Sequence, residues 1–249
     1  MSAVDKDRFL ECLAADFTRL RAVVEGALDA PVPSCPGWTG ADLARHVAEV
    51  YLHKTETMRR GAWPAPWPPE LPDVLPALDD AYRGLVAELT ARDVTDKALT
   101  WYAHDQTVGF WLRRMAHETV IHRLDAELAA GAEHDPIPAD LAVDGIDELV
   151  ACFLAYASEE DPDEIAEYLA DCDGRTVQIA TEGAGWQVQL GPETVTVERG
   201  ESDAEAAVVG DPGAVLRWVW RRAGDDEVRL NGNRWAIGKL RALLGAATQ

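Results

Sequence analysis

The hydrophobic pattern changes its period once along the chain, and this change most constrains the fold. Before about residue 160, apolar residues recur three and four positions apart, which is typical of amphipathic helices. After the acidic segment SEEDPDE, residues 158–164, apolar and polar residues alternate and glycines separate the runs, as in a β-meander. The sequence therefore predicts a two-part α+β chain, with a helical domain over residues 1–160 and a small α+β domain over residues 165–249.

Capping residues and glycines limit the predicted elements. Thr39 is expected to cap the second helix, because Asp42 follows three residues later in an acidic first turn. Gly131 follows the fourth helix, as glycine often does at a helix end. The predicted helices of the first domain span residues 6–27, 40–60, 74–92, 107–131 and 139–158. In the second domain we expect strands within residues 175–183, 185–191, 193–200, 204–210 and 227–232, and helices within 213–224 and 234–246.

The charge of the chain excludes several classes of partner. A net charge of -21 opposes binding to a nucleic-acid backbone, which is itself a polyanion. No uninterrupted apolar run reaches the ~20 residues that a membrane-spanning helix needs. The segment MSAVDKDRFLECLAADF is acidic where a signal peptide would be basic and then apolar. We expect a cytoplasmic protein, a monomer or a homodimer, that binds neither nucleic acid nor a membrane.

The four cysteines are scattered and form no CxxC pair, so neither a disulfide framework nor a cysteine zinc site is indicated. Reduced and mostly buried thiols are the expectation for Cys12, Cys152 and Cys172. Cys35 stays open, because SCPGW places it in a turn ahead of a helix.

One group of residues suggests chemistry. Glu118 and His122 are four residues apart in the strongly apolar stretch WLRRMAHETVIHRLDAELAAG. At ~100° per residue they lie about one turn apart on one face of a helix, and His46 on another predicted helix supplies a second imidazole. Three protein ligands leave a coordination position open, as in catalytic metal sites. The alternative is a surface i,i+4 pair worth a few tenths of a kcal/mol, and spacing alone does not decide between the two.

Two rival sets are disfavoured by helix geometry. HETVIH resembles the zinc-protease motif HExxH, but His117 and His122 are five apart and diverge by ~140°. His46, Glu49 and His53 share one face of a single helix, a stacked arrangement that rarely closes around one ion. We expect His117 beside the site or on its rim, and His53 in solvent or behind the ligands.

Neighbouring residues have two interpretations each. Asp125, one turn beyond His122, either accepts that histidine's other N–H or is a surface acid. Trp63 and Trp67, in the loop GAWPAPWPPELP, either line a pocket or pack against the bundle. Trp38 is expected to anchor the second helix.

The segments CPGWTGADLARHVAEV, QTVGFWLRRMAHETVIHRLDAE and VLRWVWRRAGDDEVRLNG resemble the mycothiol-dependent maleylpyruvate isomerase-like family. The resemblance spans nearly the whole chain, with the third segment the weakest match. It implies a DinB-like four-helix bundle followed by a small α+β domain similar to sterol carrier proteins. It also implies a metal, usually zinc, held at His46, Glu118 and His122, the same three residues chosen on spacing.

The family's isomerase uses an arginine in a Trp-x-Arg pattern, which Trp220-Arg221-Arg222 matches. Arg222 is the matching position, but Arg221 stands where the family often has glycine, so either is a catalytic candidate. The resemblance implies an enzyme in which a zinc-activated mycothiol thiolate attacks a small electrophile, by transfer or by cis–trans isomerisation. Two alternatives remain: a metal-dependent hydrolase, and a non-catalytic module that binds a hydrophobic or thiol-conjugated ligand.

Overall fold

The chain forms two compact units. A computed structural model describes residues 4–160 and 162–248. Their internal contacts divide into a first unit over residues 4–135 and a second unit over residues 136–248. Each unit has its own buried core and is described separately below.

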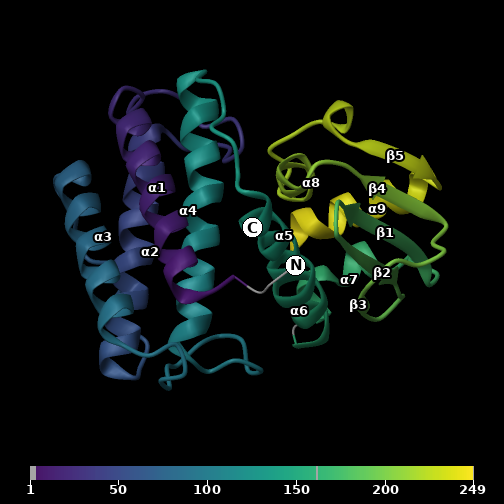
Figure 1. Cartoon of the computed structure of the whole chain (residues 1–249), viewed down its shortest axis with the longest axis horizontal. Coiled ribbons are helices and arrows are strands. Elements are labelled where there is room, and N and C mark those ends of the chain that lie inside the picture. The colour runs from purple at the N-terminus through teal and green to yellow at the C-terminus, as the bar shows by residue number, and fades with distance from the viewer. Residues whose placement is uncertain (1–3, 161, 249) are drawn as a thin grey trace. The chain divides into compact units, whose positions relative to one another are not determined.

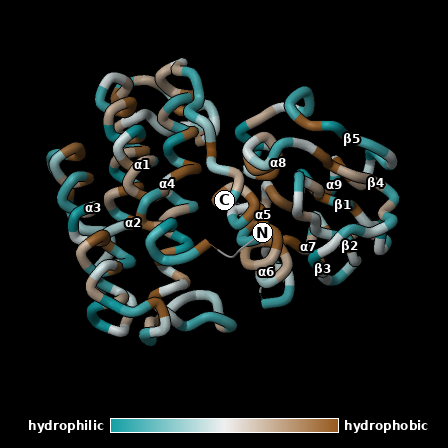
Figure 2. The backbone as a smooth tube through the Cα atoms, viewed as in Figure 1, coloured by the Kyte–Doolittle hydropathy of each residue, from teal (hydrophilic) through white to brown (hydrophobic). Residues whose placement is uncertain are grey.

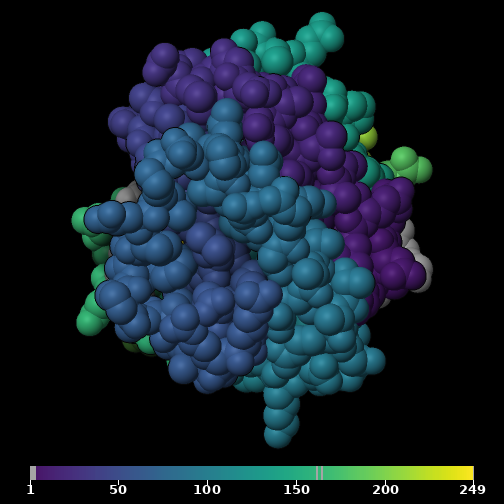
Figure 3. Space-filling model, turned by 90° about the vertical axis from the view of Figure 1, so that its left-hand side faces the viewer, coloured from purple at the N-terminus to yellow at the C-terminus, as the bar shows by residue number. Residues whose placement is uncertain are grey.

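The first unit is a four-helix bundle. Its helices are α1 (Lys6–Glu25), α2 (Gly40–Arg60), α3 (Val74–Ala91) and α4 (Val108–Ala130). The helix α1 packs along α4, and α2 packs against both α3 and α4 (Figure 1). Hydrophilic and hydrophobic residues both occur along each helix (Figure 2), as expected of helices that bury one face. Seen from the side of α3, the surface is made of purple side chains of α1 and blue side chains of α2 and α3 (Figure 3). The predicted helices and the four-helix bundle are confirmed.

Local sequence signals set the ends of α2 and α4. The Thr39 side chain accepts from the backbone N–H of Asp42, and the Asp42 carboxylate accepts from the N–H of Thr39 at 2.9 Å, which completes a capping box. Thr107 caps α4 in a similar way through the N–H of Phe110. Gly131 ends α4 with a φ of 60°, a left-handed conformation that glycine adopts without a steric penalty. The predicted capping by Thr39 and helix end at Gly131 are confirmed.

The helix α4 is buried on most of its surface, including many polar positions. Charged groups so far from solvent need partners inside the protein. Arg123, fully buried, contacts Asp16 of α1 at 2.7 Å and Glu127 of α4 at 2.9 Å. The buried polar and charged residues of α4 are Arg114, His117, Thr119, His122, Arg123, Asp125 and Glu127. This helix is therefore the polar centre of the first unit.

The second unit is an α+β fold around a five-stranded mixed sheet. The strands β1 (Arg175–Thr181), β2 (Ala184–Leu190) and β3 (Val195–Arg199) form the predicted antiparallel meander. The strand β4 (Ala206–Val209) pairs parallel to β1, and β5 (Arg229–Gly232) pairs antiparallel to β4, so the order is β3-β2-β1-β4-β5. The other elements are α5 (Ala139–Glu148), a π-helix (Leu149–Ala155), α6 (Tyr156–Glu160), α7 (Pro162–Leu169), α8 (Pro212–Val219), a short 3-10 helix (Asp225–Glu227) and α9 (Arg234–Ala246).

Part of the acidic segment that the sequence marks as a linker is helical. Residues 158–160 end α6, and α7 begins at Pro162, an unpredicted helix that proline at its first position favours. Asp161 lies outside the described residues. Upstream, α5 packs on α8, and the π-helix that continues it packs on β3 and α9. Contacts therefore group α5 with the sheet, whereas the sequence predicts domains over 1–160 and 165–249; those domain limits stay a prediction.

Within residues 4–160 and 162–248, no helix is both long and apolar enough to cross a membrane. No disulfide joins cysteines in the same ranges, in agreement with the predicted reduced thiols.

We predict that Gly40→Ala destabilises the protein by about 1–3 kcal/mol, because its new Cβ would lie 2.2 Å from the backbone oxygen of Ala27 and the start of α2 must shift. The matched control is Gly84→Ala in α3, where a Cβ meets no atom within 4 Å. That variant should be stabilised by about 0.5–1 kcal/mol through helix propensity. Urea unfolding followed by circular dichroism measures both, and equal midpoints for the two variants would contradict the prediction.

Candidate metal centre

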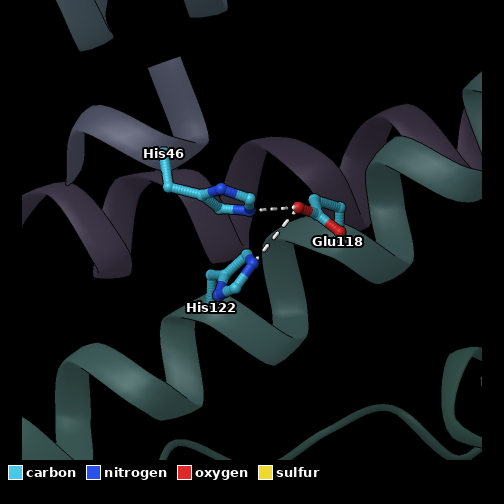
Figure 4. A group of neighbouring side chains, drawn as sticks. All are labelled: His46, Glu118 and His122. Atoms are coloured by element: carbon cyan, nitrogen blue, oxygen red, sulfur yellow. Dashed lines mark hydrogen bonds and ion pairs between the residues drawn. The ribbon is translucent and has the colours of Figure 1, made fainter. Parts of the chain in front are cut away.

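Three predicted ligands converge between α2 and α4. The Nε2 atom of His46 lies 3.2 Å from Oε1 of Glu118, and Nε2 of His122 lies 3.1 Å from the same oxygen. Figure 4 shows both rings directed at that oxygen, one from α2 and one from α4. One ligand atom from each residue lies within 4.8 Å of the other two. The structure thus brings together the three residues that spacing selects.

The second oxygen of Glu118 is held from within α4. Arg114, four residues earlier and only 4% exposed, donates to Oε2 of Glu118 at 2.6 Å. Burial alone raises the pKa of Glu118, but His122, His46 and Arg114 outweigh it and hold that pKa well below its usual value. The carboxylate is therefore ionised, with Oε1 left to face the two imidazoles.

His122 lies between two carboxylates. Its Nδ1 is 2.9 Å from Oδ2 of Asp125, and its Nε2 faces Glu118. Burial alone lowers the pKa of His122, but Glu118 and Asp125 raise it to about 9. A neutral imidazole has one N–H and cannot donate to both acceptors. The arrangement therefore requires either a second proton on His122 or a metal ion at Nε2.

The chemistry of these donors fits a zinc ion. Two imidazole nitrogens and one carboxylate oxygen form a ligand set used by catalytic zinc, with one position left for water or substrate. Ligand atoms of a tetrahedral ion with bonds of ~2.0–2.1 Å lie ~3.4 Å apart, close to the 3.1 and 3.2 Å between each Nε2 atom and Oε1. The Asp125 contact to Nδ1 is the usual support behind such a ligand. The same donors also suit other divalent metals that bind imidazole.

The turn before α2 supports both histidines. The Ser34 hydroxyl donates to Asp125 at 2.5 Å, and the Cys35 thiol lies 3.8 Å from the other Asp125 oxygen. Trp38 packs against the ring of His46, with centroids 4.9 Å apart. The segment SCPGWT therefore orients His122 through Asp125, packs on His46, and caps the helix that carries His46. Trp38 anchors α2 as predicted, and Asp125 accepts the second N–H of His122.

A buried hydrogen bond links α2 to α4 beside the three ligands. The hydroxyl of Tyr51, fully buried in α2, is 2.5 Å from Oγ1 of Thr119 in α4. Thr119 also donates to the carbonyl of Met115 at 2.6 Å. This contact limits sliding of α2 along α4 and so stabilises the approach of His46 to Glu118.

The rival ligand sets are separated. His53 contacts Lys54 and two tryptophans rather than Glu118. His117, next to Glu118 in sequence, is buried and meets the ring of Phe9 of α1 with centroids 5.9 Å apart. His53 therefore does not support a ligand from behind, and His117 points to α1 rather than to a rim.

The two candidate arginines belong to the second unit. Arg222 donates to the carbonyl of Trp220 at 2.7 Å, and its guanidinium lies 5.9 Å from the centre of that ring. Arg221 has a φ of 62°, a left-handed conformation rare for non-glycine residues. Its guanidinium lies against α9, where a Cβ on Gly245 would be 3.0 Å from it. Arg221 thus stands in a backbone conformation that glycine adopts without strain, at the position where the family often has glycine.

Comparison with known proteins supports the resemblance inferred from the motifs. Residues 10–127, just under half of the chain, match the family described as "Mycothiol maleylpyruvate isomerase N-terminal domain". This part of the chain is therefore similar to that domain family. The match includes the capped start of α2 and all three converging side chains. No curated protein sequence matches the chain.

Two solved structures share the fold over nearly the whole chain. A mycothiol-dependent maleylpyruvate isomerase matches with a TM-score of 0.59 and 16% identity, covering 94% of this chain and 97% of the other. A histidine-to-alanine mutant of that isomerase matches with a TM-score of 0.62, 15% identity and the same coverage. A "UbiJ-SCP2 Ubiquinone synthesis protein" covers 46% of this chain with a TM-score of 0.32, which is too weak to carry an argument. The predicted order of a helical bundle and then an α+β fold is thus shared with the isomerase.

Arg114 and Ser34 contribute contacts to the candidate centre but were not predicted from the sequence as its supports. The signal for Arg114 is its i,i+4 spacing to Glu118, although arginines on a long helix are more often solvated. Ser34 reaches Asp125 across 91 positions of sequence, and no local pattern marks such a contact.

We predict that His46→Ala and His122→Ala each lose stoichiometric zinc, because two protein ligands do not retain the ion against dialysis. His53→Ala is the matched control and should keep zinc, since His53 lies outside the converging group. Elemental analysis of the dialysed variants measures this. Stoichiometric zinc in either of the first two variants would refute the ligand assignment.

We also predict that Asp125→Asn weakens zinc binding about 10- to 100-fold, because Nδ1 of His122 loses its charged acceptor. Glu49→Gln changes a carboxylate one turn from His46 on the same helix but outside the converging group, and this variant should bind zinc as the parent protein does. A competition titration with a chelator gives both affinities, and an unchanged value for Asp125→Asn would show that this contact does not support the ligand.

Proposed function

We propose that this protein binds zinc, or another divalent metal, through His46, Glu118 and His122 and uses mycothiol as a cosubstrate. Its substrate would be a small electrophile, transformed by thiol transfer or by cis–trans isomerisation of the maleylpyruvate type. The observation that carries the proposal is the single oxygen of Glu118 facing both Nε2 atoms, in a unit of the mycothiol maleylpyruvate isomerase family.

The residues around the centre have separable roles in this proposal. Asp125 keeps the proton of His122 on Nδ1, so that the lone pair of Nε2 is directed at the ion. Arg114 holds Oε2 of Glu118 and leaves Oε1 as the ligand atom. His46 is the most exposed of the three, with a side chain 36% exposed, and in this proposal small molecules would approach the centre past it.

The metal and the thiol supply the reactive group. A bound metal would lower the pKa of a coordinating thiol and so would supply a nucleophile for addition to an electrophilic carbon, reversibly in the case of isomerisation. No side chain need act as the nucleophile. This agrees with the absence of a Ser-His-Asp or Cys-His signature in the sequence.

Arg222, or Arg221 in its place, would stabilise the negative charge on the substrate. A guanidinium binds a carboxylate or an enolate oxygen through paired N–H donors. Arg222 is the proposed residue because it occupies the matching position of the Trp-x-Arg pattern. Arg221, beside Gly245 of α9, remains the second candidate.

The test combines metal analysis with mycothiol binding. The purified native protein should contain near-stoichiometric zinc, and calorimetry should detect mycothiol binding that disappears after the zinc is chelated and returns with added zinc. Maleylpyruvate should then be isomerised only when both are present. Arg222→Met should raise the KM or lower the kcat for this substrate, with Arg221→Met as the comparison.

Other outcomes would overturn the proposal. Turnover without any low-molecular-weight thiol would favour a metal-dependent hydrolase, in which the ion activates water. Absence of metal at any reasonable concentration, with a tightly held ligand and no turnover, would favour a binding module.

A further inference from the structure

Lys54 is a partly buried cation, and within residues 4–160 and 162–248 it forms no ion pair with a carboxylate. Its Nζ donates to Nδ1 of His53 at 3.1 Å and lies 5.0 Å from the centre of the Trp111 ring. Among the described residues, no carboxylate oxygen lies within 4.0 Å of this amine. Burial lowers the pKa of Lys54 to about 8, so the amine is still mostly protonated at neutral pH. One N–H of the ammonium serves His53, and the other donors are available to a ligand.

Three tryptophans contact this pair of residues: Trp111 lies beside the Lys54 amine, and Trp63 and Trp67 contact the ring of His53. Trp111 is fully buried and is held by a hydrogen bond from its indole N–H to the carbonyl of Leu99 at 2.9 Å. Trp63 meets Trp111 edge to face, with centroids 6.4 Å apart, and stacks on His53 at 5.6 Å. Trp67 meets His53 edge to face, with centroids 4.9 Å apart. Trp63 remains 45% exposed, which is unusual for so large an apolar side chain.

The charge and the aromatic surface of this cluster indicate the kind of ligand that it can bind. Several tryptophan faces together often bind an ammonium cation. Here Lys54 already places an ammonium over the Trp111 ring, and a second cation would be repelled. An anion with a flat apolar body fits both the cation and the aromatic surface, because its charge pairs with Lys54 and its body packs on the accessible indole rings of Trp63 and Trp67.

The cluster lies along the same helices as the candidate metal centre. Trp111 precedes Glu118 by seven residues on α4, and Lys54 follows His46 by eight on α2. Each separation is about two helical turns, or ~10–12 Å. The charges of Glu118 and Arg114 both shift the pKa of the Lys54 amine, so the cluster lies within electrostatic range of the candidate metal centre. A substrate of a few carbons at the centre would reach toward Lys54.

We propose that Lys54, His53 and the tryptophans Trp63, Trp67 and Trp111 form a binding site for a planar unsaturated carboxylate. The Lys54 ammonium pairs with the carboxylate, and neutral His53 and the buried Trp111 ring position that ammonium. The accessible indole rings of Trp63 and Trp67 pack on the conjugated body. Identifying this ligand as the substrate rests on the proposed function, whereas the binding site itself needs neither zinc nor mycothiol.

The experiment is calorimetric titration of the metal-free full chain with cinnamate, maleate and the uncharged cinnamamide. Metal-free protein excludes binding of the carboxylate to zinc. The parent protein should bind at least one of the two carboxylates, and Lys54→Met should weaken that binding about 10- to 100-fold. Lys54→Arg should restore most of it, and cinnamamide should bind equally weakly to the parent and to Lys54→Met.

Matched variants separate the site from general effects. Lys97→Met removes an exposed lysine elsewhere in the same unit, and Trp235→Leu removes another exposed tryptophan. Both should bind the carboxylate as the parent does, whereas Trp63→Leu should weaken it. Circular dichroism and zinc retention by Lys54→Met establish that this variant is folded.

The inference is overturned if neither carboxylate binds the parent up to about 10 mM, or if Lys54→Met binds as tightly as the parent. It is also overturned if cinnamamide binds as tightly as cinnamate. These failures are distinct from failure of the proposed function. If the protein takes up no zinc but binds the carboxylate through Lys54, the carboxylate site is supported and the proposed function is not. If the protein binds mycothiol in a zinc-dependent way but shows no Lys54-dependent carboxylate binding, only the proposed function is supported.

Discussion

The largely buried carboxylate of Glu118, 14% exposed, is the constraint on which the rest of the first unit depends. A charge so placed costs several kcal/mol unless each of its oxygens is satisfied. Arg114 satisfies one oxygen from the preceding turn, and His46 and His122 face the other. Since His46 comes from another helix, α2 and α4 must pack in one register for the charge to be compensated. The packing of α2 on α4 and the geometry of the candidate centre therefore depend on each other.

The need to hold the residues around Glu118 in one geometry explains why the short turn before α2 makes several contacts with them. SCPGWT reaches Asp125 through Ser34, packs Trp38 on His46 and caps α2 through Thr39. Each contact restricts a different degree of freedom: the ring of His122, the ring of His46, and the start of the helix. Gly40 belongs to this arrangement because the backbone of Ala27 comes too close for any side chain there. A binding centre made on two helices needs such rigid support to hold its ligand atoms in place.

The parts of the centre predictable from the sequence are those set by local geometry. Glu118 and His122 lie on one face of a helix whatever the tertiary fold, and Thr39 with Asp42 marks where the helix of His46 begins. That these two helices lie side by side is predicted from the family resemblance of the motifs. The contacts of Ser34 and Lys54 depend on how segments far apart in sequence meet, and no periodicity encodes them. The helix α7 was missed because its acidic, proline-containing start also fits a linker.

The distribution of charge shows how such a protein could hold an anion at all. The chain carries 44 acidic and 23 basic residues, so its long-range field repels anionic ligands. Several of its cations are withdrawn from the surface: Arg114 and Arg123 are buried on α4, and Lys54 is partly buried on α2. At physiological salt the repulsion is screened beyond about 8 Å, while contacts between partly buried groups are screened much less. Affinity for an anion must therefore come from short-range, partly desolvated contacts. Lys54 beside Trp111 supplies one, because among the described residues it forms no direct ion pair with an acidic side chain.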